Sequence, residues 1–258
     1  MSRRYSVLVY HRLAGEGKPG QERIDVPAAT FATQMRMLRR AGFRLLTLAE
    51  LADFHLAGRP LPGRRAAVVT VDDATADVVD PLTATRWLNV QLFVATSEVG
   101  RAVDWLGGTQ LAGWDDLARL AAAGVAVGAH SRTHPDDLTA LGDIELAREV
   151  AGSRDDLSER FGTPPRAFAY PHGRHDERVR RAVADAGFDL AFTTSVGLND
   201  AATDRFALRR VSPKAWDSRL SILWKASTGR PVPLLWERWL VLRHAAARRV
   251  STLRRDSR

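Results

Sequence analysis

Two short apolar segments of this chain end abruptly in side chains that can bind a metal ion. Residues 68–73, Val-Val-Thr-Val-Asp-Asp, end in two adjacent carboxylates. Residues 125–134 run from Val-Ala-Val-Gly-Ala into His-Ser-Arg-Thr-His. Each apolar run has the composition of a buried strand, and an unpaired charge at the tip of such a strand costs several kcal/mol. The chain must therefore fold so that a cation or another partner meets these strand ends.

Three of these side chains form a candidate set of metal ligands. His130 and His134 are four residues apart, a spacing that can bring two imidazoles to one ion, and Asp73 adds a carboxylate. Three protein ligands with a fourth position open are typical of a catalytic zinc site. Asp72 is then a candidate general base for a water held by the ion. The simpler interpretations, a helix cap at the two aspartates and a pair of surface histidines, are disfavoured because both motifs occur together.

The composition narrows the chemistry that such a site can use. The 258 residues contain no cysteine, so a metal site must use His, Asp or Glu. With 45% hydrophobic residues the chain can form one sizeable core, and one α/β domain is expected. The first residues lack the apolar stretch and cleavage site of a secretory signal, and no run of ~18 apolar residues is present. A cytoplasmic location is therefore expected, with association to a membrane left open.

Apolar runs alternate with helical patterns along most of the chain. Strands are predicted over residues 5–10, 43–47, 66–71, 90–95, 125–129, 166–170, 189–194 and 206–211. Helices are predicted over residues 28–41, 114–123, 143–161 and 176–186, and each is followed by a glycine, the usual C-terminal stop. Strands that alternate with helices predict a parallel sheet with helices outside it.

The candidate active residues all follow the carboxyl ends of predicted strands. They are His11, Asp72 and Asp73, His130, and Pro171 with His172. In a parallel α/β barrel these strand ends share one face, and that face carries the chemistry. We therefore expect these side chains to meet at one site.

Three motifs resemble those of the polysaccharide deacetylases, the NodB-homology or carbohydrate esterase family 4 group. Residues 70–74, Thr-Val-Asp-Asp-Ala, are similar to the family's first motif, TFDDG, and residues 130–134 are similar to its second, H-S/T-x-x-H. Residues 168–173, Phe-Ala-Tyr-Pro-His-Gly, resemble the third motif in the form typical of the branch related to poly-N-acetylglucosamine deacetylases. The resemblance extends from residue 7 to residue 211, about four fifths of the chain.

The resemblance implies a fold, a reaction and a set of roles. The fold is a distorted, incomplete (β/α) barrel of about seven parallel strands with helices outside. The reaction is the hydrolysis of an N-acetyl or O-acetyl group on a carbohydrate, which in the first case breaks an amide bond that is not a peptide bond. By position, Asp72 would be the general base. Asp73, His130 and His134 would bind one divalent ion, usually zinc. Tyr170, Pro171 and the backbone N–H of His172 would contact the substrate or the oxyanion.

The motifs also depart from the family's pattern. Ala74 replaces the glycine of the first motif, and His172 replaces the usual tyrosine of the third. Ala169 stands where other branches have an arginine that orients the base, and Arg210 is a candidate to supply that charge, or an ordinary ion-pair partner. The late motif with the family's general-acid histidine is not recognisable. His172 and His11 are the histidines best placed to protonate the leaving amine, although each also has a purely structural interpretation.

Residues 229–258 form a separate, basic segment. They contain eight arginines against Glu237 and Asp256, a net charge of +6, whereas the first 228 residues carry +2. We therefore divide the chain into a deacetylase-like domain, residues 1–228, and a basic C-terminal helix and tail, residues 229–258. The leucines and tryptophans of this segment fit either a helix packed on the barrel or one lying on an anionic membrane surface. No motif supports nucleic-acid binding, and the sequence does not indicate an oligomeric state.

Three functions are compatible with these observations. The leading hypothesis is a metal-dependent deacetylase of an acetylated carbohydrate. The alternatives are a catalytically inactive sugar-binding barrel, suggested by Ala74 and the missing acid motif, and a deacetylase of a small intracellular metabolite, suggested by the missing signal. The intact set of Asp72 and the three candidate ligands favours catalysis, because a pure binding domain has no need for a base that activates water.

Overall fold

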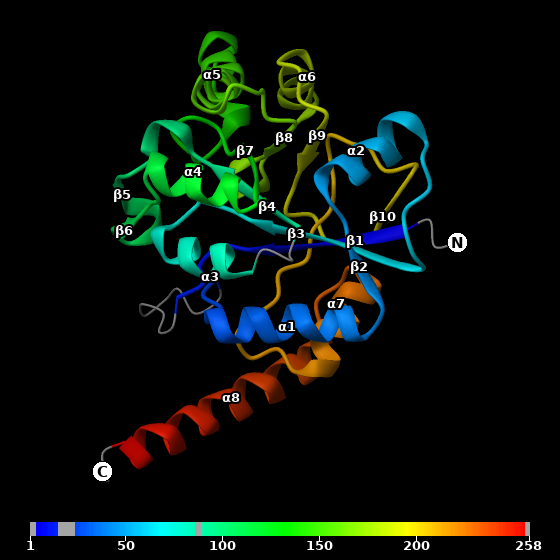
Figure 1. Ribbon diagram of the computed structural model, residues 1–258, viewed down its shortest axis with the longest axis vertical. Coiled ribbons are helices and arrows are strands. Elements are labelled where there is room, and N and C mark those ends of the chain that lie inside the picture. Colours follow the sequence, from blue (N-terminus) through cyan, green and yellow to red (C-terminus); the bar gives the residue numbers. More distant parts are fainter. Residues whose placement is uncertain (1–3, 15–23, 86–88, 256–258) are drawn as a thin grey trace.

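A curled, mainly parallel sheet with helices around it organises the structure, a computed structural model that describes residues 4–14, 24–85 and 89–255 (Figure 1). The strand order is β10-β1-β3-β4-β7-β8-β9, and β2 pairs with β3. All pairs are parallel except that of β10 with β1. The bounds are β1 Arg4–Tyr10, β2 Phe43–Leu45, β3 Arg65–Val71, β4 Val90–Val94, β7 Ala126–Ala129, β8 Ala167–Ala169, β9 Leu190–Phe192 and β10 Asn199–Asp200. The predicted incomplete barrel of about seven parallel strands is confirmed.

Four helices lie close to where the sequence places them: α1 Ala28–Arg40, α4 Trp114–Ala122, α5 Asp143–Phe161 and α6 Glu177–Asp185. The local chemistry explains their ends. The Asp176 side chain accepts a hydrogen bond from the Val179 N–H at the start of α6, and Gly162 takes the left-handed conformation that ends α5. Sequence reasoning missed α2 Leu48–Ala57, α3 Val79–Ala84 and α7 Arg219–Thr228.

Short elements fill the connections between the strands and these helices. Five are 3₁₀ turns: η1 Ala76–Val78, η2 Thr96–Glu98, η3 Asp104–Leu106, η4 Leu138–Ala140 and η5 Pro171–Gly173. Strands β5 Ala102–Val103 and β6 Thr109–Gln110 pair with each other, apart from the main sheet. The hairpin that they form carries Trp105, whose contacts are described below.

The segment predicted as a strand over residues 206–211 is an interrupted one. It lies between β9 and β1 but forms only isolated bridges, Leu208 with Phe192 and Val211 with Leu8. The interruption has a local cause, because the backbone of Arg209 pairs with the side chain of Asn199 instead of a strand. The segment nevertheless spans the gap between the two strands, and it places Arg210 inside the barrel.

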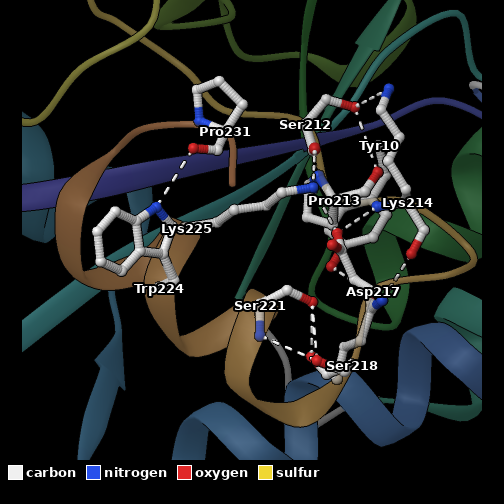
Figure 2. Close-up of polar contacts among 11 residues, drawn as sticks. Tyr10, Ser212, Pro213, Lys214, Asp217, Ser218, Ser221, Trp224, Lys225 and Pro231 are labelled. Atoms are coloured by element: carbon white, nitrogen blue, oxygen red, sulfur yellow. Dashed lines mark hydrogen bonds and ion pairs between the residues drawn. The ribbon is translucent and has the colours of Figure 1, made fainter. Parts of the chain in front are cut away.

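Buried polar contacts fix α7 against the chain that follows this segment (Figure 2). The Lys225 ammonium donates to the Asp217 carboxylate at 2.6 Å and to the Ser212 carbonyl at 3.1 Å. The side chains of Lys225 and Asp217 are 3% and 0% exposed, so this ion pair is buried. Tyr10 is connected to the same region through Gln34, which donates to a backbone carbonyl there. The network ties the end of β1 to α1 and α7.

The last helix, α8 Leu234–Arg255, extends away from the sheet and its other helices (Figure 1). It follows α7 after a short turn. The indole N–H of Trp224, a residue of α7, donates to the Pro231 carbonyl in this turn at 3.2 Å (Figure 2). Helix α7 ends at Thr228, and the division of the chain into two parts at residue 228 stays a prediction. In the described part of the chain, no helix combines the length and the apolar character needed to cross a membrane.

The Lys225→Met variant should unfold with a free energy about 3 to 5 kcal/mol lower than that of the wild type, because it leaves the Asp217 carboxylate buried and unpaired. Chemical denaturation measures this difference. Adding Asp217→Asn should restore part of the loss, because the double variant buries no charge. Single and double variants of equal stability would show that the pair does not anchor α7.

Candidate functional site

Four strand ends bring the predicted side chains to one site. The residues that follow β1, β3, β7 and β8 are, in turn, His11, Asp72 and Asp73, His130 and His134, and His172. Ring contacts join three of the histidines, since the centroid of His134 lies 4.9 Å from that of His130 and 4.8 Å from that of His172. The side chains that follow four different strands therefore meet at the carboxyl ends of the parallel sheet, as the sequence predicts.

Asp72 is held by a bidentate ion pair with Arg210. The two terminal guanidinium nitrogens donate to the two carboxylate oxygens at 2.7 and 2.8 Å, and both side chains are buried. The Arg210 Nε donates to the Thr193 carbonyl at 2.7 Å, which fixes the plane of the guanidinium. Burial raises the pKa of Asp72, but Arg210 and two nearby histidines outweigh it and bring the pKa to about 2. Asp72 is therefore ionised and oriented.

Asp73 is compensated much less. Burial and the neighbouring charge of Asp72 raise the pKa of Asp73 to about 7, and Arg210 opposes this only in part. Because the guanidinium of Arg210 pairs with Asp72 alone, a charge on the adjacent buried carboxylate of Asp73 requires a further cation. The two adjacent aspartates after β3 therefore need a cation, as their sequence predicts.

Asp73, His130 and His134 have the geometry of a candidate metal site. The Nε2 atoms of His130 and His134 lie 3.7 and 3.5 Å from Oδ1 of Asp73, and the potential ligand atoms all lie within 4.8 Å of one another. The Nδ1 atom of His130 is 2.7 Å from the Ala169 carbonyl. A carbonyl only accepts, so Nδ1 carries the proton and Nε2 presents its lone pair. The donor set of two imidazoles and one carboxylate fits zinc.

Both of these histidines are neutral at physiological pH. Burial lowers the pKa of His130 and, together with the neighbouring histidines, lowers the pKa of His134 to about 2. Neutral imidazole is the form that binds metals.

Backbone strain concentrates in the three loops that form the site. Among the described residues, those other than glycine with positive φ, between 54° and 67°, are Asp73, Ala74, Ser131, His134 and His172. Such conformations cost of order 1 to 3 kcal/mol each and cluster at functional sites. Ala74 adopts this conformation in place of the family's glycine and is 1% exposed, so its methyl group is accommodated inside the protein.

Glu149 of α5 holds the loop that carries His134, and sequence reasoning missed it. Its carboxylate accepts hydrogen bonds from the backbone N–H groups of Arg132 and Thr133, each at 2.9 Å, and from the Thr133 hydroxyl at 2.7 Å. These contacts offset part of the strain in the loop. No pattern in the sequence connects a helical glutamate with this loop.

Trp105 also contacts the candidate ligands and was missed in this role. Its ring stacks on that of His134, with a centroid separation of 4.6 Å and an interplanar angle of 8°. Its indole N–H is close enough to the Asp73 carboxylate to lower the pKa of that group, although the indole nitrogen forms no hydrogen bond with the described residues. Trp105 therefore restricts the orientation of a ligand histidine from outside the ligand set.

His11 and His172 differ in their burial. The Nδ1 atom of His11 is buried without a hydrogen-bond partner among the described residues, and burial lowers the pKa of its imidazole to about 4, against the opposing charge of Asp72. The His172 side chain is 40% exposed, with Nε2 3.7 Å from the Asp136 carboxylate. His11 thus belongs to the interior of the site and His172 to its rim.

The structure places the side chain of Tyr170 in the core, away from the predicted substrate contact. It is 0% exposed, and its hydroxyl donates to the Phe206 carbonyl at 2.9 Å. The physical reason is that its ring packs in a buried apolar cluster, where it contacts Phe168 edge-to-face and stacks on His175. Pro171 is buried as well, and it leads into the left-handed conformation of His172.

The comparisons with known proteins agree with this geometry. Residues 61–191 match the family model described as polysaccharide deacetylase. An uncharacterised protein of Streptomyces coelicolor, SCO4760, is 29% identical over 180 residues, which cover 62% of this chain and 68% of that protein. IcaB from Ammonifex degensii superposes with a TM-score of 0.71 at 27% identity, covering 83% of this chain and 93% of that one. The Streptococcus pyogenes deacetylase PplD, solved in complex with acetate, superposes with a TM-score of 0.75 at 20% identity, covering 88% and 99%.

The chain belongs to the polysaccharide deacetylase family, because the family match spans just over half of its length and includes the Asp72–Asp73 and His130–His134 motifs. The resemblance stated from the sequence motifs is thereby confirmed. Family membership supports carbohydrate deacetylation as the activity and an acetylated carbohydrate as the class of substrate.

Proposed function

We propose that this protein is a metal-dependent hydrolase that removes acetyl groups, N-acetyl before O-acetyl, from a carbohydrate. One observation carries the proposal: a buried Asp-His-His group with convergent ligand atoms lies beside an ionised carboxylate that is oriented by a buried arginine. Sugar binding alone does not require two adjacent buried carboxylates of which only one is paired with an arginine. The preferred ion is zinc, which the donor set fits.

Asp73, His130 and His134 would hold the ion. When bound, a divalent ion polarises the acetyl carbonyl and makes water a better nucleophile. Asp72 accepts the proton of the attacking water, and its bidentate contact with Arg210 keeps it ionised and aimed. The backbone N–H of His172, which follows the buried Pro171, would donate to the developing oxyanion.

The wild-type protein should retain about one zinc ion per chain after dialysis, and His134→Ala should lose it, because two ligands no longer close the site. Elemental analysis by mass spectrometry measures the bound metal. His175→Ala is the matched control, since His175 lies outside the ligand group and should leave the zinc content unchanged. Undiminished, tightly held zinc in His134→Ala would remove the ligand assignment.

Release of acetate from a panel of N-acetylated sugars and glycans tests the function directly, with metal-stripped and zinc-restored protein. Asp72→Asn should lower kcat by ~10²-fold or more while zinc stays bound, because asparagine keeps the shape but cannot accept the proton. The exposed Asp115→Asn is the control for the same chemical change and should retain full activity. Near-normal turnover in Asp72→Asn would exclude it as the base.

The leaving amine must be protonated, and His11 and His172 are the two candidates. Because the pKa of His11 is lowered to about 4, its imidazole is mostly neutral near pH 7, which favours His172 as the donor. His11→Phe or His172→Phe should lower activity on acetamides more than on acetyl esters, because an alkoxide leaves more readily than an amide anion does. Paired rate measurements on an N-acetyl and an O-acetyl sugar resolve the difference. Equal losses on both substrates would assign the residue to binding, and unchanged rates in both variants would assign proton delivery to water.

A further inference from the structure

The outer face of α8 is apolar and uncovered. Leu235, Trp239 and Leu242 are 81%, 54% and 70% exposed. Their spacing of four and then three residues places them on one face of the helix. Leu234 and Val241 extend this face, and Leu220 of α7 adds a further exposed apolar side chain. A contiguous group of exposed apolar side chains such as this one is typical of an interaction surface.

The opposite face of α8 is fixed to the protein, so the apolar face points outward. Leu240 is 1% exposed, and Trp236 packs edge-to-face against Trp224 of α7 at 6.3 Å. Trp224 is itself anchored by its hydrogen bond to Pro231 (Figure 2). The start of α8 therefore cannot roll its leucines inward without breaking contacts with α7.

Arginines accompany the apolar face. Arg238 and Arg243 are exposed, and the guanidinium of Arg243 lies over the Trp239 ring at 5.0 Å from its centroid. The sequence from residue 229 to residue 258 carries a net charge of +6. Leucine and tryptophan on one face with arginine beside them is the composition of helices that lie in the interface of an anionic membrane.

The charge selects among the possible occupants of this face. A second copy of the chain would bring two segments of charge +6 against each other, which opposes association. A nucleic acid would satisfy the arginines but not the leucines. An anionic lipid surface satisfies both, because the apolar side chains enter the acyl boundary while the arginines reach the phosphates.

We propose that α8 lies on the surface of an anionic membrane, with Leu235, Trp239 and Leu242 inserted and Arg238 and Arg243 at the headgroups. This surface is separate from the candidate metal site, so the proposal does not depend on the proposed function. The helix rests in the interface and does not cross the bilayer, in agreement with its polar composition.

Co-sedimentation of the full chain with vesicles tests the proposal. The protein should bind vesicles of phosphatidylcholine with phosphatidylglycerol and not vesicles of phosphatidylcholine alone, and high salt should weaken the binding. Leu235→Ser with Leu242→Ser should lower the partition coefficient by about tenfold or more. Arg238→Gln with Arg243→Gln should lower it roughly fivefold for each arginine.

Arg59→Gln with Arg181→Gln is the control, since both side chains are exposed on the body of the protein and the charge change is the same. This control should bind like the wild type, and all variants should keep the wild-type circular dichroism. Three outcomes would overturn the proposal: no binding to anionic vesicles, equal loss in the control, or a dimer in sedimentation equilibrium that Leu235→Ser with Leu242→Ser dissociates. The last outcome would assign the face to a second copy of the chain.

Discussion

The rest of the site depends on the buried ion pair between Asp72 and Arg210. It joins the end of β3 to the interrupted segment between β9 and β1, two parts of the chain that are 138 residues apart in sequence. Removing one partner of such a pair leaves an unpaired buried charge, at a cost of about 3 to 5 kcal/mol. The pair therefore orients the Asp72 carboxylate and connects β3 to the segment that closes the gap between β9 and β1. It further makes the two adjacent aspartates chemically different, because only Asp72 receives the guanidinium.

The loops around this pair are strained, and nearby contacts compensate for the strain. Residues other than glycine keep left-handed conformations only where several surrounding contacts hold them there. Glu149 does this for the loop after β7 by accepting from two consecutive backbone N–H groups, and the Ser131 hydroxyl accepts from the His134 N–H at 3.0 Å. Trp105 adds a stacking contact from a separate hairpin. Together these contacts hold the imidazole of His134 near its Asp73 partner, which is a form of preorganisation.

The sequence predicted the fold class and the candidate site where the signal is local. Each apolar run stops at a chemically distinct side chain, so the strand ends, the glycine-terminated helices and the meeting of Asp73 with His130 could all be inferred. The failures are non-local. The alternation over residues 206–211 looks like a strand, but the Asn199 side chain takes the backbone groups of Arg209. Sequence reasoning proposed Arg210 as a candidate only, because its pairing depends on how the barrel curls.

The body of the protein and α8 use charge in opposite ways. At the site, the charges of Asp72 and Arg210 are buried and paired, so salt screens this interaction weakly and its geometry is fixed by neighbours. On α8, Arg238 and Arg243 are exposed beside an apolar face, where they interact over a Debye length of about 10 Å at 0.1 M salt. Ionic strength therefore acts on the two surfaces separately. Attachment through α8 can be weakened by salt while the ion pair that orients Asp72 persists, because the first interaction faces water and the second excludes it.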